Sequence, residues 1–144
     1  MISKSLEETA KIAKGLADKI RPHASRAAVL ALSGDLGSGK TTFSKAFAAA
    51  LGIHESEVSS PTFVIMKSYD LHNRNHFKKF IHIDAYRLER AEEVERLGWK
   101  ETIGDPGNLV LIEWPENIGG ALPKEATTIR FKFVDEVTRE IYFD

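Results

Sequence analysis

One glycine-rich stretch, GDLGSGKT at Gly34–Thr41, constrains this chain more than any other feature. It fits the pattern G-x-x-x-x-G-K-[ST], in which the backbone turns tightly and its N–H groups point toward phosphate oxygens. The apolar run from Ala28 to Ser33 is typical of a short buried strand, and Lys40 to Leu51 has the pattern of a helix. A strand, a glycine-rich turn and a helix in this order predict a phosphate-binding loop, whereas an ordinary strand-to-helix turn is the simpler alternative.

The motif predicts a role for individual residues of this loop. Gly34, Gly37 and Gly39 allow the tight turn that brings backbone N–H groups to the phosphates. Lys40 is expected to lie along the β- and γ-phosphates of a nucleoside triphosphate, and Thr41 to place its hydroxyl on Mg²⁺. The helix that follows offers its positive N-terminal end to the same anion.

Length and composition favour one globular domain. The chain has 144 residues, of which 42% are hydrophobic and 28% charged. Lys and Arg number 20 against 21 Asp and Glu, so no overall field favours DNA or an anionic membrane, and any role with nucleic acid would be local or through a partner. Cysteine is absent, which excludes disulfides, thiolate metal sites and thiol nucleophiles. Since no apolar run has the length of a membrane-spanning helix and the start lacks a signal-peptide core, the cytoplasm is expected.

The first predicted helix runs from Ser5 to Ile20 and is amphipathic. Ser5 and Glu8 form a capping-box pattern, and Pro22 ends the helix. Its apolar positions at helical spacing are Leu6, Ala10, Ala13, Leu16, Ala17 and Ile20. We expect this helix to cover one face of a sheet, and a second possibility is that its first turn, near Leu6 and Thr9, lines a nucleotide base pocket.

A polar segment from residue 53 to residue 62 has no apolar periodicity. It leads through Pro61 and Thr62 into an extended run, Phe63 to Met66. Such a segment could hold a γ-phosphate sensor, with Thr62 supplying the hydroxyl, or it could be a plain loop in which Pro61 marks the start of a strand. Downstream, Leu71 to Phe77 predicts the turn of a hairpin.

Two predicted hydrophobic strands end in carboxylates, Asp84 after the run from Phe80 and Glu113 after the run from Leu109. Mg²⁺ takes hard oxygen ligands, so two acids beside a phosphate-binding loop predict a metal site, although either acid alone could be an ordinary strand-end charge. His82 lies on the same strand face as Asp84 and is expected to be a half-buried structural residue.

The remaining elements are short. Leu88 to Leu97 is predicted to be a charged helix with Ala91, Val94 and Leu97 inward, and Gly98 to cap it. Thr127 to Val134 and Arg139 to Phe143 alternate as two strands of a C-terminal hairpin.

Four motifs occur in order along the chain: Gly34–Phe43, Ser60–Phe63, His82–Leu88 and Leu111–Glu116. They resemble the successive signatures of the TsaE (YjeE) family, the small bacterial ATPases of tRNA threonylcarbamoyladenosine synthesis. The resemblance spans essentially the whole chain and includes a Ser-x-x-x-Thr start at Ser5 and Thr9. The departures are modest, since Ser38 stands where the family more often has Ala and Ala85 where it often has Leu.

The resemblance implies a fold and a partner. The fold is α/β, a single P-loop NTPase domain with a mixed sheet, in which parallel strands surround the loop and antiparallel hairpins are added, flanked by helices. The activity is that of an ATPase that binds ATP or ADP with Mg²⁺ and docks on the TsaB–TsaD enzyme. Contact with tRNA is then indirect, through that complex, and no membrane is involved.

The resemblance also implies a residue set. Lys40, Asp84 and Glu113 serve catalysis, and Thr41, Glu113 and Asp84 serve the metal. The residues that hold the nucleotide are Leu6, Thr9, Gly34, Gly37, Ser38, Gly39, Lys40, Thr41, Thr42, Thr62, Asp84 and Arg139. Trp114, beside Glu113, could report on the site, face the partner or be a packed core residue.

Two other functions remain open at this stage. A small-molecule phosphotransferase would share the phosphate loop but should carry an arginine-rich lid, for which Arg87, Arg90 and Arg96 are the clustered residues. A nucleotide-dependent binding switch with little hydrolysis would use the same loop and metal ligands.

Overall fold

A computed structural model describes residues 1–54, 65–72 and 76–144. Its central feature is a seven-stranded sheet with the strand order β1-β7-β6-β2-β5-β4-β3. The strands are β1 (Ile2–Ser3), β2 (Ala28–Gly34), β3 (Met66–Asp70), β4 (Lys79–Asp84), β5 (Asn108–Glu113), β6 (Thr127–Phe133) and β7 (Arg139–Phe143).

The middle of this sheet is parallel and its margins are antiparallel. β2 pairs in parallel with β5 on one side and β6 on the other, and β4 pairs in parallel with β5. β3, β7 and β1 extend the sheet by antiparallel pairing. The near-continuous apolar runs of β2 and β5 suit strands that are covered on both faces. The expected mixed α/β sheet with flanking helices is therefore confirmed.

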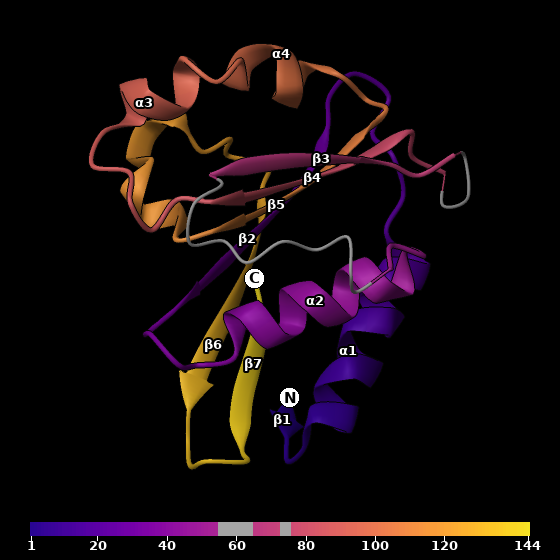
Figure 1. Cartoon of the computed structure of the whole chain (residues 1–144), viewed down its shortest axis with the longest axis vertical. Coiled ribbons are helices and arrows are strands. Elements are labelled where there is room, and N and C mark those ends of the chain that lie inside the picture. Colours follow the sequence, from indigo (N-terminus) through magenta and orange to yellow (C-terminus); the bar gives the residue numbers. More distant parts are fainter. Residues whose placement is uncertain (55–64, 73–75) are drawn as a thin grey trace.

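Two helices, α1 (Leu6–Lys19) and α2 (Lys40–Ala50), cover one face of the sheet (Figure 1). They bury Ala13, Phe43 and Phe47 against Leu32 and Leu111. The predicted cap of α1 is present, since the Ser5 side chain accepts a hydrogen bond from the backbone N–H of Glu8 at 3.1 Å.

Two positions of α1 that were expected to face inward are exposed. Leu6 is 71% exposed, and Ala10 is also exposed. The buried stripe of the helix instead follows Thr9, Ala13 and Ala17, because these positions face α2 and the sheet.

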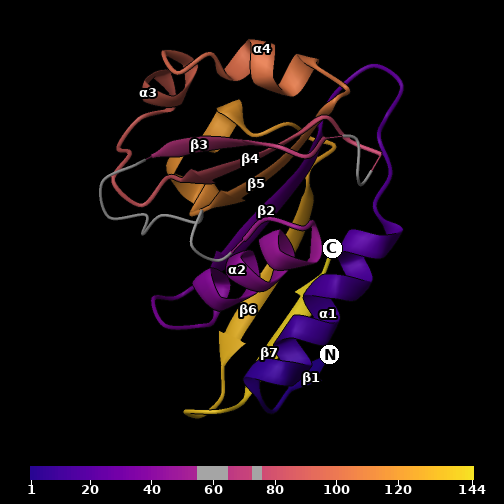
Figure 2. The ribbon, with the colours of Figure 1, turned by 45° about the vertical axis from the view of Figure 1, so that its right-hand side comes forward.

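The opposite face is covered by α3 (Ala91–Glu95), α4 (Trp99–Gly104) and two 3₁₀ turns, η2 (Pro115–Asn117) and η3 (Gly119–Ala121) (Figures 1 and 2). Val94, Trp99 and Ile118 form this second core with Ala31 and Ile112 of the sheet. The sheet is thus a middle layer between two apolar cores.

The predicted helix from Leu88 to Leu97 is wrong in its length, and α4 was not foreseen. α3 covers only its middle, and Leu97 is 41% exposed rather than inward. Gly98, with φ of 80°, turns the chain so that Trp99 starts a new helix. The buried indole Nε1 of Trp99 donates a hydrogen bond to the Ala121 carbonyl at 2.8 Å, which ties α4 to η3.

The parallel strands bring three predicted site segments to one edge of the sheet. β2 ends at Gly34, β4 at Asp84 and β5 at Glu113, and these strands are neighbours in the order β2-β5-β4. The backbone register pairs Asp84 directly with Glu113. No helix in the described part of the chain is long and apolar enough to cross a membrane.

Candidate functional site

The loop between β2 and α2 has a backbone that requires its glycines. Gly39, at the N-terminal boundary of α2, has φ of 105°, a value that residues other than glycine rarely adopt. A Cβ on Gly34 would lie 2.5 Å from the Phe131 carbonyl oxygen of β6, so the close approach of these two strands excludes a side chain there. The glycine pattern that predicted the loop is therefore matched by its conformation and packing.

Lys40 begins α2 with its side chain turned back over the loop. Its ammonium donates a hydrogen bond to the Gly34 carbonyl, and its Nζ lies 3.3 Å from the centroid of the Trp114 ring. Burial lowers the pKa of Lys40, and nearby carboxylates, led by Glu116 and Glu113, act in the opposite direction. A cation is thus held in a largely desolvated position where the motif predicts the β- and γ-phosphates.

Glu113 is the buried acid of the site, with 2% of its surface exposed. Its Oε1 accepts a hydrogen bond from the Thr41 hydroxyl at 3.3 Å, and its Oε2 lies 2.7 Å from Nε2 of His82. Asp84 stands beside it in the sheet register. Burial raises the pKa of Asp84 and the Glu113 charge adds to this shift, whereas the backbone N–H of Tyr86 opposes it.

These oxygens fit the requirements of magnesium bound with a nucleotide. Mg²⁺ in such sites takes one or two carboxylates and fills its remaining positions with phosphate oxygens and water. The Thr41 hydroxyl and the Glu113 carboxylate are already in contact, and Asp84 is adjacent. Within the described residues, no group of three or more His, Asp or Glu side chains is arranged to hold a metal by itself.

A cavity of about 340 Å³ adjoins the loop and unites residues from both ends of the chain. Its lining residues are Lys4, Ser5, Leu6, Thr9, Gly39, Thr42, Glu136, Val137 and Arg139. The predicted nucleotide residues Leu6, Thr9 and Arg139 are thereby brought beside Gly39 and Thr42. The sequence did not predict that Glu136 and Val137 line this cavity, since the residues of a hairpin tip do not indicate which part of the fold they contact.

Two of the lining residues, Thr9 and Arg139, form hydrogen bonds with other residues of the protein. The Thr9 hydroxyl is buried and hydrogen-bonded to the Ser3 hydroxyl at 2.7 Å. Arg139 donates to the carbonyl of Thr138 at 3.0 Å and to that of Asp135, and its guanidinium lies 4.8 Å from the Phe133 ring centroid. The Nε of Arg139, by contrast, is buried without a hydrogen-bond partner among the described residues.

Several predicted residues lie elsewhere. Thr62 belongs to residues 55–64, outside the described residues, so the sensor prediction stays a prediction. Arg90 and Arg96 line a surface depression on α3 with Glu89, Glu92 and Glu93. These two arginines therefore border acidic side chains and not the cavity beside the loop.

The contacts of His82 and Trp114 were not predictable from the sequence. Each joins residues that are far apart in the chain, His82 with Glu113 and Trp114 with Lys40. Strand alternation placed His82 on the face of Asp84, but only the pairing of β4 with β5 brings its ring to Glu113. Trp114 is half-buried, so it is neither a fully packed core residue nor an exposed one.

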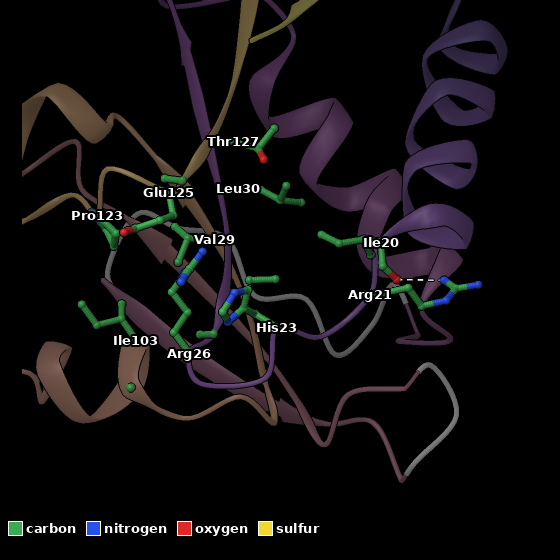
Figure 3. Close-up of a pocket in the computed structure, with 14 residues that line it drawn as sticks. Ile20, Arg21, His23, Arg26, Val29, Leu30, Ile103, Pro123, Glu125 and Thr127 are labelled. Carbon is green, nitrogen blue, oxygen red and sulfur yellow. Dashed lines mark hydrogen bonds between the residues drawn. The ribbon is translucent and has the colours of Figure 1, made fainter.

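A second cavity, of about 420 Å³, lies at the start of β2, whereas the loop follows the end of that strand (Figure 3). Arg21, His23, Arg26 and Glu125 are its charged or titratable lining residues, and Val29, Leu30 and Ile103 are among its apolar ones. The two cavities are therefore at opposite ends of the strand.

Comparisons with known proteins identify the family of this chain. The family model described as "Threonylcarbamoyl adenosine biosynthesis protein TsaE" matches residues 3–141. The tRNA threonylcarbamoyladenosine biosynthesis protein TsaE of Bacillus subtilis is 42% identical over 137 residues, which cover 95% of this chain and 79% of that protein. The protein of the same name from Rickettsia felis is 34% identical over 139 residues, with 96% and 75% covered.

A solved structure is similar over nearly the whole chain. The crystal structure of Bacillus subtilis YdiB superimposes with a TM-score of 0.74 at 36% sequence identity, covering 99% of this chain and 82% of that one. Together with the family match and the two relatives, this shows that the chain belongs to the TsaE family of threonylcarbamoyl adenosine biosynthesis proteins.

Proposed function

We propose that this protein is a magnesium-dependent ATPase that supports the formation of N6-threonylcarbamoyladenosine in tRNA by docking on the TsaB–TsaD enzyme. Membership of the TsaE family supports the assignment to threonylcarbamoyl adenosine biosynthesis. The observation that carries the ATPase part is the contact between the Thr41 hydroxyl and the Glu113 carboxylate, with Lys40 in the same loop and Asp84 adjacent in the sheet. The reaction takes place in the cytoplasm, where tRNA and ATP are both available.

The glycine-rich loop binds the phosphates of ATP or ADP. Backbone N–H groups from Gly37 to Thr42 surround them, and the ammonium of Lys40 moves from the Gly34 carbonyl to the β- and γ-phosphates. This exchange is favourable because phosphate oxygens carry more charge than a carbonyl oxygen. Ser38, whose buried hydroxyl has no hydrogen-bond partner among the described residues, gains a phosphate oxygen as an acceptor.

Glu113 and Asp84 have different roles in the proposed reaction. Glu113 and Thr41 would hold Mg²⁺, which would supply positive charge to offset the charge of the phosphates. Asp84, which is paired with Glu113 in the sheet register, orients the attacking water. The cavity of Leu6, Val137 and Arg139 receives the base and sugar of the nucleotide.

The partner enzyme completes the site. Arg139 is the arginine that lines the nucleotide cavity. Its guanidinium already donates hydrogen bonds to the carbonyls of Asp135 and Thr138. An arginine finger supplied from outside is one way in which related folds accelerate phosphoryl transfer. The isolated protein should therefore hydrolyse ATP slowly and speed up on TsaB–TsaD, with tRNA contacting the complex and not this subunit.

A binding switch with little hydrolysis is the second function that the same residues support, because the loop and metal ligands would serve it equally. A phosphotransferase is less favoured, since Arg90 and Arg96 lie among acidic residues on α3. Comparing single-turnover with steady-state hydrolysis of ATP, with and without TsaB–TsaD, distinguishes these functions. We expect slow turnover alone and faster turnover with the pair, whereas a switch would bind the pair in a nucleotide-dependent way without repeated turnover.

A further inference from the structure

We infer that His82 is a positioning residue that holds the Glu113 carboxylate in the orientation needed to bind Mg²⁺. This inference rests on the proposed function. It assigns to the histidine a role in metal binding without direct contact to the metal.

The two oxygens of Glu113 have different partners. Oε2 lies 2.7 Å from the His82 Nε2, and Oε1 lies 3.3 Å from the Thr41 hydroxyl. A carboxylate that binds Mg²⁺ is ionised and only accepts hydrogen bonds, so the inferred role requires a protonated Nε2 of His82 as the donor. The short contact with His82 fixes the plane of the carboxylate, and Oε1 is then directed toward Thr41, where the motif places the metal.

The His82 ring is itself held rigidly. Its residue lies within β4, between β3 and β5, and pairs with Leu111 on β5. The ring stacks on Phe80 with a centroid separation of 6.2 Å and an interplanar angle of 20°. A donor with so little freedom loses little conformational entropy when it orients its partner.

Burial makes this single donor important. Glu113 is 2% exposed and the His82 side chain 14%, so water has little access to replace a lost hydrogen bond. If the donor is removed, Oε2 must find a new partner, and rotation of the carboxylate would carry Oε1 away from Thr41. Partners of this kind behind a metal ligand typically contribute about 10- to 100-fold to metal affinity.

Three substitutions separate hydrogen bonding from packing. His82→Phe keeps a ring that can stack on Phe80 but removes the donor. His82→Gln restores an N–H group three bonds from Cβ, the same number as Nε2 of histidine, whereas the amide nitrogen of His82→Asn is one bond too short. Thermal unfolding of each variant shows whether the fold is retained.

The first measurement is the Mg²⁺ dependence of ADP affinity, determined by calorimetry on the full chain. We expect His82→Phe and His82→Asn to need about tenfold more Mg²⁺ for half-maximal affinity. The ADP affinity in excess chelator should be unchanged, and His82→Gln should resemble the wild type. Equal losses in His82→Phe and His82→Gln, both folded, would overturn the inference, as would a wild-type response in His82→Phe.

The second measurement needs no nucleotide. In the metal-free protein, the imidazole N–H resonance of His82 should be protected from exchange, and it should lose that protection in Glu113→Leu, which has no side-chain acceptor. An unprotected resonance in the wild type would overturn the inference even if the substitutions at His82 impair folding. If the wild type bound nucleotide without any response to Mg²⁺, the proposed function itself would be wrong. A Mg²⁺ response that does not depend on His82 would instead overturn only the inference.

Discussion

The ammonium of Lys40 lies on the face of the Trp114 ring, with Nζ 3.3 Å from the ring centroid. Lys40 begins α2 and Trp114 follows β5 in a left-handed backbone conformation, with φ of 60°. The indole also contacts Tyr86, whose ring centroid is 5.1 Å away. The lysine that the motif assigns to the phosphates is therefore held by a cation–π contact as well as by the Gly34 carbonyl.

Nucleotide binding should change the fluorescence of Trp114. When Lys40 turns from the indole to the phosphates, the ring loses a cation in direct contact with it. The second tryptophan, Trp99, is buried with its Nε1–H donated to the Ala121 carbonyl, and it provides the control. We expect the ADP-induced change in emission to persist in Trp99→Phe and to vanish in Trp114→Phe. Binding detected by calorimetry without any change in Trp114 emission would show that Lys40 does not leave the ring.

Replacing Lys40 by alanine should nearly abolish ATP binding. The substitution removes a cation from a desolvated position, and hydrogen bonds to charged groups contribute about 1.5–3 kcal/mol each. We expect ATP affinity by calorimetry to fall at least tenfold. Lys45→Ala, at an exposed position one turn later in α2, is the matched control and should bind ATP as the wild type does. Unchanged affinity and hydrolysis in Lys40→Ala would contradict the phosphate-binding assignment.

Asp84→Asn and Glu113→Gln should both reduce ATP hydrolysis strongly, since each removes an anionic oxygen from the predicted metal and water site. A Mg²⁺ titration of hydrolysis by each variant is the measurement, and at least one variant should need more Mg²⁺. If both variants hydrolysed ATP normally over the whole titration, the two-acid site would be wrong.

Asp84 should also make the stability of the metal-free protein depend on pH. Its pKa is raised in the folded state, so folding favours the protonated carboxyl, and the free energy of unfolding falls as pH rises through that pKa. Asp84→Asn cannot ionise and should lose this contribution. We expect urea unfolding to show the variant gaining stability relative to the wild type from about pH 4 toward neutrality. A constant difference across this range would show that Asp84 titrates normally.

Gly34→Ala should destabilise the fold, because the added Cβ would lie 2.5 Å from the Phe131 carbonyl oxygen and the backbone of β6 would have to move. We expect a loss of about 1–3 kcal/mol in the free energy of urea unfolding. Gly15→Ala in α1 is the matched control, since its Cβ would meet no described residue outside the backbone of its own helix within 4 Å. This substitution should add about 0.5–1 kcal/mol. Equal stabilities of the two variants would contradict the packing assigned to Gly34.

The sequence by itself determined the local units of this protein. The glycine-rich motif and its flanking apolar runs predicted β2, the loop and α2, and the Ser5 and Glu8 pattern predicted the start of α1. These features depend on residues within a few positions of one another, through backbone hydrogen bonds, caps and periodicity. Alternation also placed His82 and Asp84 on one strand face, but it did not predict α4, because a short helix after Gly98 has too few residues for a periodic pattern.

Only the tertiary structure decided which of these units meet. Glu113 reaches Thr41 and His82 because β5 lies between β2 and β4, and no local pattern specifies that strand order. Leu6 and Arg139 border one cavity because β1 pairs with β7, which joins the two ends of the chain. Strand order is set by how both faces of the sheet bury their apolar residues together, so it depends on the whole chain and not on any single segment.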